Sequence, residues 1–336
     1  MAVPPSMLAL PSSLPTILRE IRPLAPARRS LCRHAVSHPR RIVPGMTYLL
    51  TRRCAQRTFR LRPSPETNRI FTYCLAFAAV GTGVLVHAAC VMSNHHHLVV
   101  TDVHGRLPDF LRELHRLTAK ALNASQGQWE NLWAGEPCNV VRLATDEDIE
   151  DKIAYVVANP VAAGLVEKPE DWPGFLTWGA TAHHVKRPEA YFREDGTCPP
   201  ALTLRIEPPR PRDLEPVASS EGSMARVHRL VADKVAAARK ALRAAGRRFL
   251  GRAAVLASSF AQRACSYEQR FGVIPTFAAQ QRDVRDSLRR IEQTFRTRYR
   301  TALERWRTGR REVLFPSGTW AMVVMHAAVV DGATLS

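Results

Sequence analysis

Residues 84–101 read VLVHAACVMSNHHHLVVT, and this stretch decides the fold. Apolar residues fill both ends of the stretch, while Ser93 and Asn94 interrupt it with the polar residues that are typical of a turn. The stretch therefore predicts two neighbouring strands, Val84–Met92 and His95–Thr101, joined by a short connection.

Five further elements are expected around this strand pair. Hydrophobic periodicity and helix-start and helix-stop signals predict two more strands and three helices: Thr47–Arg53, Pro65–Val80, Leu107–Ala124, Cys138–Leu143, and a helix from Thr145 to near Asn159. The resulting order of strand, helix, two strands, helix, strand and helix predicts an α+β fold, with an antiparallel sheet and helices on one side of it.

The last of these helices is delimited by its own residues. Thr145 with Asp148 three positions later predicts a capping box, and Asp146 lies in the first turn, where the helix dipole favours anions. Pro160 disfavours helical conformation in the residue before it, so the helix is expected to end near Asn159.

Positive charge is concentrated in the two ends of the chain. The 336 residues include 48 Lys and Arg against 30 Asp and Glu, which gives a net charge of +18. Residues 1–45 contribute +6, residues 46–200 contribute −1 and residues 201–336 contribute +13. Such an excess favours nucleic acid over a membrane surface as the partner, because basic side chains that meet phosphates release condensed counterions.

Composition divides the chain into four parts. Residues 1–45 are rich in Pro, Ser and Arg without a regular period, so a disordered or spurious N-terminal extension is expected there. Residues 46–185 form the predicted globular domain with the elements above. Residues 186–223 are expected to be a linker with several prolines, and residues 224–336 a basic, mainly helical DNA-binding region.

Two features bear on the compartment. The apolar run Leu75–Met92 is interrupted by Gly81, Gly83 and His87, so it does not predict a membrane span. The seven cysteines are scattered and form no CxxC pair, which argues against a disulfide framework or a zinc ribbon. A reducing, cytoplasmic location is expected.

Three consecutive histidines are the sharpest chemical feature. Strand alternation places His95 and His97 on one face of the sheet and His96 on the other. Two imidazoles at this spacing can share one cation, although a histidine pair by itself is more often an accidental polar run or a pair of solvated side chains.

A second feature lies on the predicted last helix. Tyr155 and Asn159 are one helical turn apart and therefore on the same face, so a phenol and an amide can serve one site. Alone, the pair also fits an amphipathic helix whose tyrosine dips into the core with its hydroxyl at the rim.

In this order the two motifs resemble those of the single-tyrosine HUH transposases, in particular the REP-associated tyrosine transposases. The histidine strand lies within VMSNHHHL, residues 91–98, and the tyrosine helix within YVVANPVAAGLV, residues 155–166. The following PEDWP, residues 169–173, resembles the family's usual continuation. The resemblance spans about Met46–Trp178 and implies a ferredoxin-like HUH catalytic domain.

The resemblance also implies roles for individual residues. His95, His97 and Asn159 would be ligands of a divalent metal, Mg or Mn, and Tyr155 the nucleophile. In the family, attack joins the 5′ end of cleaved single-stranded DNA to the tyrosine and releases a 3′-OH, which permits rejoining without ATP. The protein is therefore expected to be a metal-dependent transposase of a bacterial mobile element. Its expected partner is single-stranded or hairpin DNA, and no membrane partner is expected. It would act as a monomer or a homodimer.

Two positions of this sequence depart from the family pattern. Ser93 stands where the family usually has proline, and His96 stands at a normally apolar position, where a buried neutral imidazole needs a hydrogen-bond partner.

Two other functions are alternatives to the transposase. A domesticated, non-catalytic protein that binds repeat hairpins is one alternative. The other is a metal-dependent nuclease that uses activated water.

The basic tail is expected to contribute affinity rather than sequence recognition. Its arginines and lysines lie in stretches with helical spacing and could hold a hairpin stem by its backbone. The residues concerned are Arg239, Lys240, Arg243, Arg247, Arg248, Arg282, Arg285, Arg289, Arg290, Arg296, Arg298 and Arg300.

Overall fold

The computed structural model describes residues 39–192, 196–209, 220–265 and 275–332 of the chain. They belong to one compact unit that begins at Pro39, while the unit Met1–His38 lies outside the described residues. Residues 39–45 of the predicted extension therefore belong to the compact unit, and Ile42 is buried in its main hydrophobic cluster.

Five strands form a mixed, mostly antiparallel sheet in the order β2-β3-β1-β4-β7. The strands are β1 (Met46–Arg53), β2 (Val84–Met92), β3 (His95–Asp102), β4 (Asn139–Leu143) and β7 (Phe277–Ala278). Only the pair of β4 and β7 is parallel. The register of β1 against β3 pairs Thr51 with His97 and Arg53 with His95, so the first strand lies beside the histidines.

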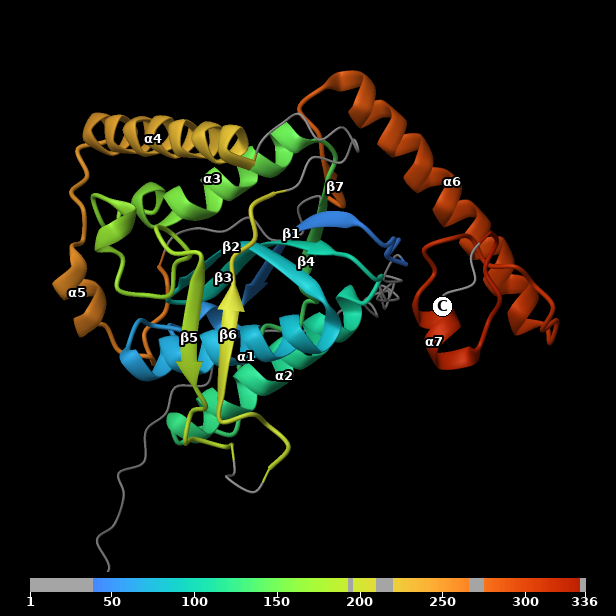
Figure 1. Cartoon of the computed structure of the whole chain (residues 1–336), viewed down its shortest axis with the longest axis horizontal. Coiled ribbons are helices and arrows are strands. Elements are labelled where there is room, and N and C mark those ends of the chain that lie inside the picture. Colours follow the sequence, from blue (N-terminus) through green and yellow to red (C-terminus); the bar gives the residue numbers. More distant parts are fainter. Residues whose placement is uncertain (1–38, 193–195, 210–219, 266–274, 333–336) are drawn as a thin grey trace, which may run out of the picture. The chain divides into compact units, whose positions relative to one another are not determined.

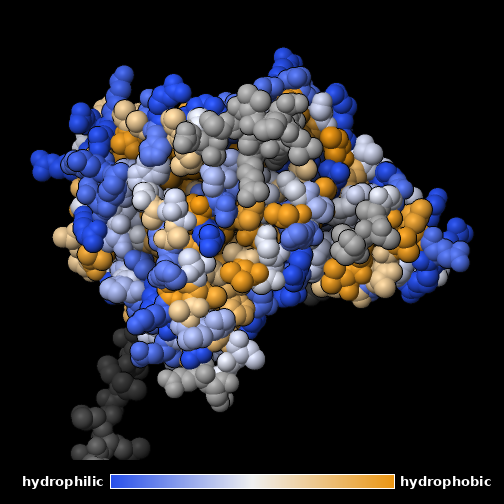
Figure 2. Space-filling model, in the orientation of Figure 1, coloured by the Kyte–Doolittle hydropathy of each residue, from blue (hydrophilic) through white to orange (hydrophobic). Residues whose placement is uncertain are grey.

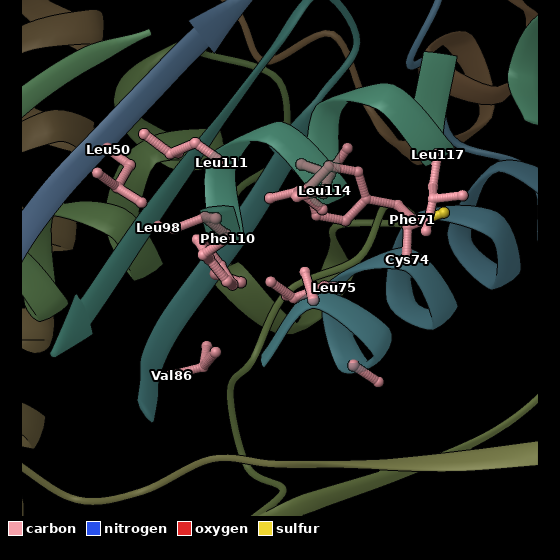
Figure 3. Close-up of a cluster of buried hydrophobic side chains, with 14 of the residues drawn as sticks. Leu50, Phe71, Cys74, Leu75, Val86, Leu98, Phe110, Leu111, Leu114 and Leu117 are labelled. Carbon is pink, nitrogen blue, oxygen red and sulfur yellow. The ribbon is translucent and has the colours of Figure 1, made fainter. Parts of the chain in front are cut away.

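Helices cover both faces of this sheet. On one face, α1 (Pro65–Thr82) and α2 (Leu107–Ser125) pack on a cluster that includes Leu98 and Val100 of β3 (Figure 3). On the other face lies α3 (Asp146–Ala162), as Figure 1 shows. It packs on a cluster that includes Val99. The α+β class is confirmed, but the expected placement of helices on one side is wrong, because the apolar runs of β2 and β3 supply buried side chains to both faces.

The boundaries of α1 and α3 follow from their end residues. Ser64 caps α1 by accepting a hydrogen bond from the Thr67 backbone N–H at 3.0 Å, and the capping box at the start of α3 is present as predicted. Asn159 lies in the last turn of α3, close to the predicted end, although the helix runs on through Pro160 to Ala162. A proline in the last turn removes a single hydrogen bond, and the burial of Val161 there offsets that loss.

The chain beyond α3 is not divided as predicted. The expected linker, residues 186–223, contains β6 (Ala201–Arg205), which pairs with β5 (Ala182–Lys186) in a hairpin against α1. The expected separate C-terminal region contributes α4 (Ser220–Ala244), which packs along α3, and the edge strand β7. Both belong to the same compact unit as the sheet.

Five smaller or peripheral elements complete the described chain. They are the helices α5 (Arg252–Ala257), α6 (Arg282–Arg307) and α7 (Ala321–His326), and the short 3-10 turns η1 (Ala55–Arg57) and η2 (Pro169–Asp171). A small hydrophobic cluster of its own holds α6 to the segment that follows it, with Ala302, Phe315 and Met322 buried.

No described helix combines the length and the apolar character that crossing a membrane requires. On the face drawn in Figure 2, hydrophilic residues dominate the rim and hydrophobic residues lie between them. The cysteines of the described residues are free thiols, and Cys54, Cys74, Cys90 and Cys138 are buried.

Candidate functional site

The two outer histidines of β3 face the same side of the sheet. The ring centroids of His95 and His97 lie 4.7 Å apart, with the rings nearly perpendicular, while His96 points into the opposite cluster. The alternation predicted for the strand is therefore confirmed. His97 is buried at 6% exposure and His95 is half-buried, so the pair lies at the edge of the core.

Each imidazole is held through its Nδ1 atom. The Nδ1 of His97 lies 2.8 Å from the Thr51 hydroxyl oxygen, and the Nδ1 of His95 lies 2.6 Å from the Asn94 amide oxygen. Because Asn94 Oδ1 can only accept, Nδ1 of His95 carries the proton and Nε2 is left with its lone pair. These contacts fix how both rings are oriented.

Tyr155 and Asn159 of α3 reach the same place from above the sheet. The ring centroids of Tyr155 and His97 are 5.4 Å apart, and the Asn159 side chain lies close enough to the Tyr155 hydroxyl to act on its pKa. Tyr155 is 37% exposed, which leaves part of the phenol open to solvent. All four residues that the sequence pointed to are brought together in one chain.

A lysine and an aspartate complete the surroundings of the tyrosine. The Lys152 ammonium lies 6.0 Å from the Tyr155 ring centroid and 2.7 Å from a carboxylate oxygen of Asp151. The other oxygen of Asp151 lies 2.7 Å from the ammonium of Lys234 on α4. Burial would raise the pKa of Asp151, but the hydrogen bonds from the two lysines outweigh it and hold that pKa below its ordinary value.

Burial sets the charge state of the histidines and the tyrosine. Burial, together with the nearby guanidinium groups of Arg53 and Arg57, lowers the pKa of His95 to about 4. Burial also lowers the pKa of His97 well below its ordinary value, so both rings are neutral at pH 7. The pKa of Tyr155 is raised by burial, against which the hydrogen bond from Asn159 and the charge of Lys152 act.

The donor set suits a divalent cation. Neutral imidazoles whose Nδ1 is engaged by a hydroxyl or an amide present Nε2 as a ligand, which is the usual arrangement at metal sites in proteins. Asn159 adds an amide oxygen from the facing helix. The two imidazoles and this amide are the candidate ligands. Among the described residues, no group of three or more His, Cys, Asp or Glu side chains is arranged to hold a metal.

The central histidine has a structural role on the opposite face. His96 is fully buried, and its Nε2 lies 3.1 Å from Nε2 of His115 on α2, which supplies a partner for one of its two ring nitrogens, while its buried Nδ1 has no partner among the described residues. Phe71 and Trp133 pack against the same ring. The indole N–H of Trp133 donates to the His115 carbonyl oxygen at 2.9 Å, so this tryptophan belongs to the core.

Four residues in the surroundings of the candidate site were not found from the sequence. Thr51, Asp151, Lys152 and Lys234 are common residue types without a motif. Asp151 and Lys152, four and three positions before Tyr155, have a helical spacing that could have drawn notice. The register of β1 against β3 places Thr51 beside His97, and the packing of α4 on α3 places Lys234 beside Asp151.

Comparison with solved structures finds partial similarities. A REP-associated tyrosine transposase bound to a REP hairpin is 19% identical, over 41% of this chain and 79% of the other, with a TM-score of 0.35. The chain is similar to this transposase. A provisionally assigned transposase from Deinococcus radiodurans is 22% identical, over 30% of this chain and 79% of the other, with a TM-score of 0.24. No protein-family profile and no curated protein matches the chain.

Proposed function

We propose that the protein is a transposase that cleaves and rejoins single-stranded DNA at hairpin sites through a covalent 5′-phosphotyrosine. The observation that carries the proposal is the convergence of Tyr155 with a neutral histidine pair, at 5.4 Å between the Tyr155 and His97 rings. The resemblance of the two motifs to the REP-associated family supplies the choice of DNA and of the hairpin.

Tyr155 performs the bond exchange. Its hydroxyl oxygen attacks the scissile phosphorus, the new bond joins the tyrosine to the 5′ side, and the bond from phosphorus to the 3′-oxygen breaks. The phenol gives up its proton and the released 3′-oxygen ends as a hydroxyl, so the step is balanced in protons. Attack by a 3′-OH of another strand reverses the exchange and restores the tyrosine, with no external energy source.

His95, His97 and Asn159 would hold a divalent cation, with Mg or Mn favoured by the oxygen-rich phosphate chemistry. Such an ion, when bound, supplies Lewis-acid stabilisation of the phosphate charge. Thr51 and Asn94 keep the two imidazoles in place, and Lys152 adds positive charge next to the nucleophile. Asn159 also lies beside the phenol and acts to lower the pKa of Tyr155.

The test is the search for a covalent adduct. The full chain is incubated with a labelled single-stranded DNA that carries a hairpin, in the presence of Mn, and the products are separated on a denaturing protein gel. We expect a labelled band at the mass of the protein plus DNA, absent from Tyr155→Phe, because this substitution removes only the attacking oxygen.

Two other outcomes would replace the proposal. Tight binding of the hairpin with no adduct in the wild type would identify a non-catalytic hairpin-binding protein. Cleavage that persists in Tyr155→Phe would identify a nuclease in which water is the nucleophile. A matched control is Tyr191→Phe, which removes a phenol at another exposed position and is expected to leave the adduct unchanged.

A further inference from the structure

An arginine-lined groove lies in the C-terminal part of the chain, among residues that the candidate site does not use. The groove lies between the second half of α6 and the segment 309–314, with a volume of about 800 Å³. The polar residues that line it include Arg298, Thr301, Arg305, Arg310 and Arg311.

The groove exists because the chain turns back on α6. Gly309 has a φ of +91°, a left-handed conformation that few other residues adopt without strain, and it ends the helix. The Arg310 backbone N–H then donates to the Arg305 carbonyl oxygen at 3.3 Å. Phe315, which is fully buried, anchors the far end of the returning segment.

The arginines of the groove are only partly neutralised. Arg298 lies 2.6 Å from a carboxylate oxygen of Asp331, and the guanidinium of Arg311 lies 4.5 Å from the Trp306 ring centroid. Within the described part of the chain, no ion pair involves Arg305 or Arg310. One acid, Glu312, lines the groove, so the four arginines leave a clear positive excess.

We infer that this groove binds the phosphate backbone of duplex DNA, such as the stem of a hairpin. Guanidinium groups and threonine hydroxyls are donors that bind phosphate oxygens without reading sequence. The lining contains no aromatic residue, whereas sites for unpaired strands stack bases on aromatic rings. The choice of DNA over other polyanions rests on the proposed function.

The test compares two charge-matched double variants of the full chain. One is Arg305→Gln with Arg310→Gln in the groove, and the other is Arg205→Gln with Arg229→Gln at exposed positions on β6 and α4, outside the basic residues expected to hold the stem. Affinity for a fluorescent DNA hairpin is measured by anisotropy, with EDTA to prevent cleavage, between about 50 and 200 mM salt. The proposal holds for any DNA duplex, so the hairpin sequence is arbitrary.

We expect the groove variant to bind roughly tenfold more weakly or worse, and its log affinity to depend less steeply on log salt, by about two in slope. The control variant keeps both values near those of the wild type. Arg305→Lys with Arg310→Lys should restore most of the slope, which a purely structural role of the two side chains would not allow.

Equal losses in both double variants would overturn the proposal, because the binding would then reflect net charge alone. A groove variant that weakens an unpaired strand as much as the hairpin would overturn the choice of a duplex. Failure of the proposed function is recognised separately, since it is the absence of an adduct with the wild-type chain and does not affect a binding measurement in EDTA.

Discussion

At the scale of single residues, the two imidazoles proposed as metal ligands are held neutral and in a fixed orientation by their surroundings. Burial keeps His95 and His97 neutral, and Thr51 and Asn94 occupy their Nδ1 atoms. A neutral ring with a fixed orientation loses little entropy and no proton when it binds a metal, so such partners of the ligands strengthen binding.

Thr51→Val tests this fixed orientation because it removes the hydroxyl and keeps the shape of the side chain. We expect the affinity for Mn, measured by titration calorimetry, to fall about 10- to 100-fold. Thr47→Val is the matched control: Thr47 is on the same strand and its hydroxyl bonds Thr101 instead, 2.8 Å away. Unchanged affinity in Thr51→Val, or an equal loss in the control, would contradict the role of Thr51.

At the scale of elements, α3 packs against both the sheet and α4, and it carries Tyr155. Glu150 is buried on α3, and its carboxylate accepts hydrogen bonds from the Ser223 hydroxyl at 2.7 Å and from the Arg226 guanidinium of α4. The adjacent Asp151 binds Lys234. Polar links of this kind fix the register of one helix along the other, while the apolar contacts of Val227 and Val231 supply burial.

Arg226→Ala leaves the Glu150 carboxylate with fewer donors, and we expect the free energy of unfolding to fall by about 1–3 kcal/mol. Water can replace part of the lost contact because the Arg226 side chain is 47% exposed. The free energy is measured by urea denaturation. The control is Arg229→Ala, at an exposed position on the same helix, for which a change within about 0.5 kcal/mol is expected. Equal effects of the two substitutions would show that the buried Glu150 carboxylate does not depend on Arg226.

At the scale of the whole molecule, the described chain has three hydrophobic clusters rather than one. The two large clusters lie on opposite faces of the sheet, and the third holds α6 and α7 together around Phe315. The third cluster shares no residue with the site at Tyr155. Damage to this cluster should therefore be separable from damage to the site.

Phe315→Ala removes a fully buried ring from the small cluster, and we expect a local destabilisation of about 3–5 kcal/mol. Hydrogen exchange of α6 and α7 should become faster, while exchange in β3 and α3 stays unchanged. Leu314→Ala, at a neighbouring position that is 56% exposed, should have little effect. Equal acceleration in β3 would show that the cluster and the sheet unfold as one unit.

The sequence by itself determined most helices and strands and pointed to the four candidate site residues. The apolar runs on either side of Ser93 and Asn94 give β2 and β3, strand alternation separates His96 from its two neighbours, and helical spacing puts Tyr155 and Asn159 on one face. These are local properties, since they follow from the geometry of a strand or a helix over a few residues.

Only the tertiary structure decided the rest. The second helical layer, the continuation of α3 past Pro160, and the contacts of Thr51 and Lys234 with the site arise from packing between segments that are far apart in the chain. Long-range packing can override a local stop signal, because burial of Val161 outweighs one missing hydrogen bond. Residues such as Thr51 and Lys234 belong to no sequence motif, because any hydroxyl or ammonium group that the fold placed there would make the same contact.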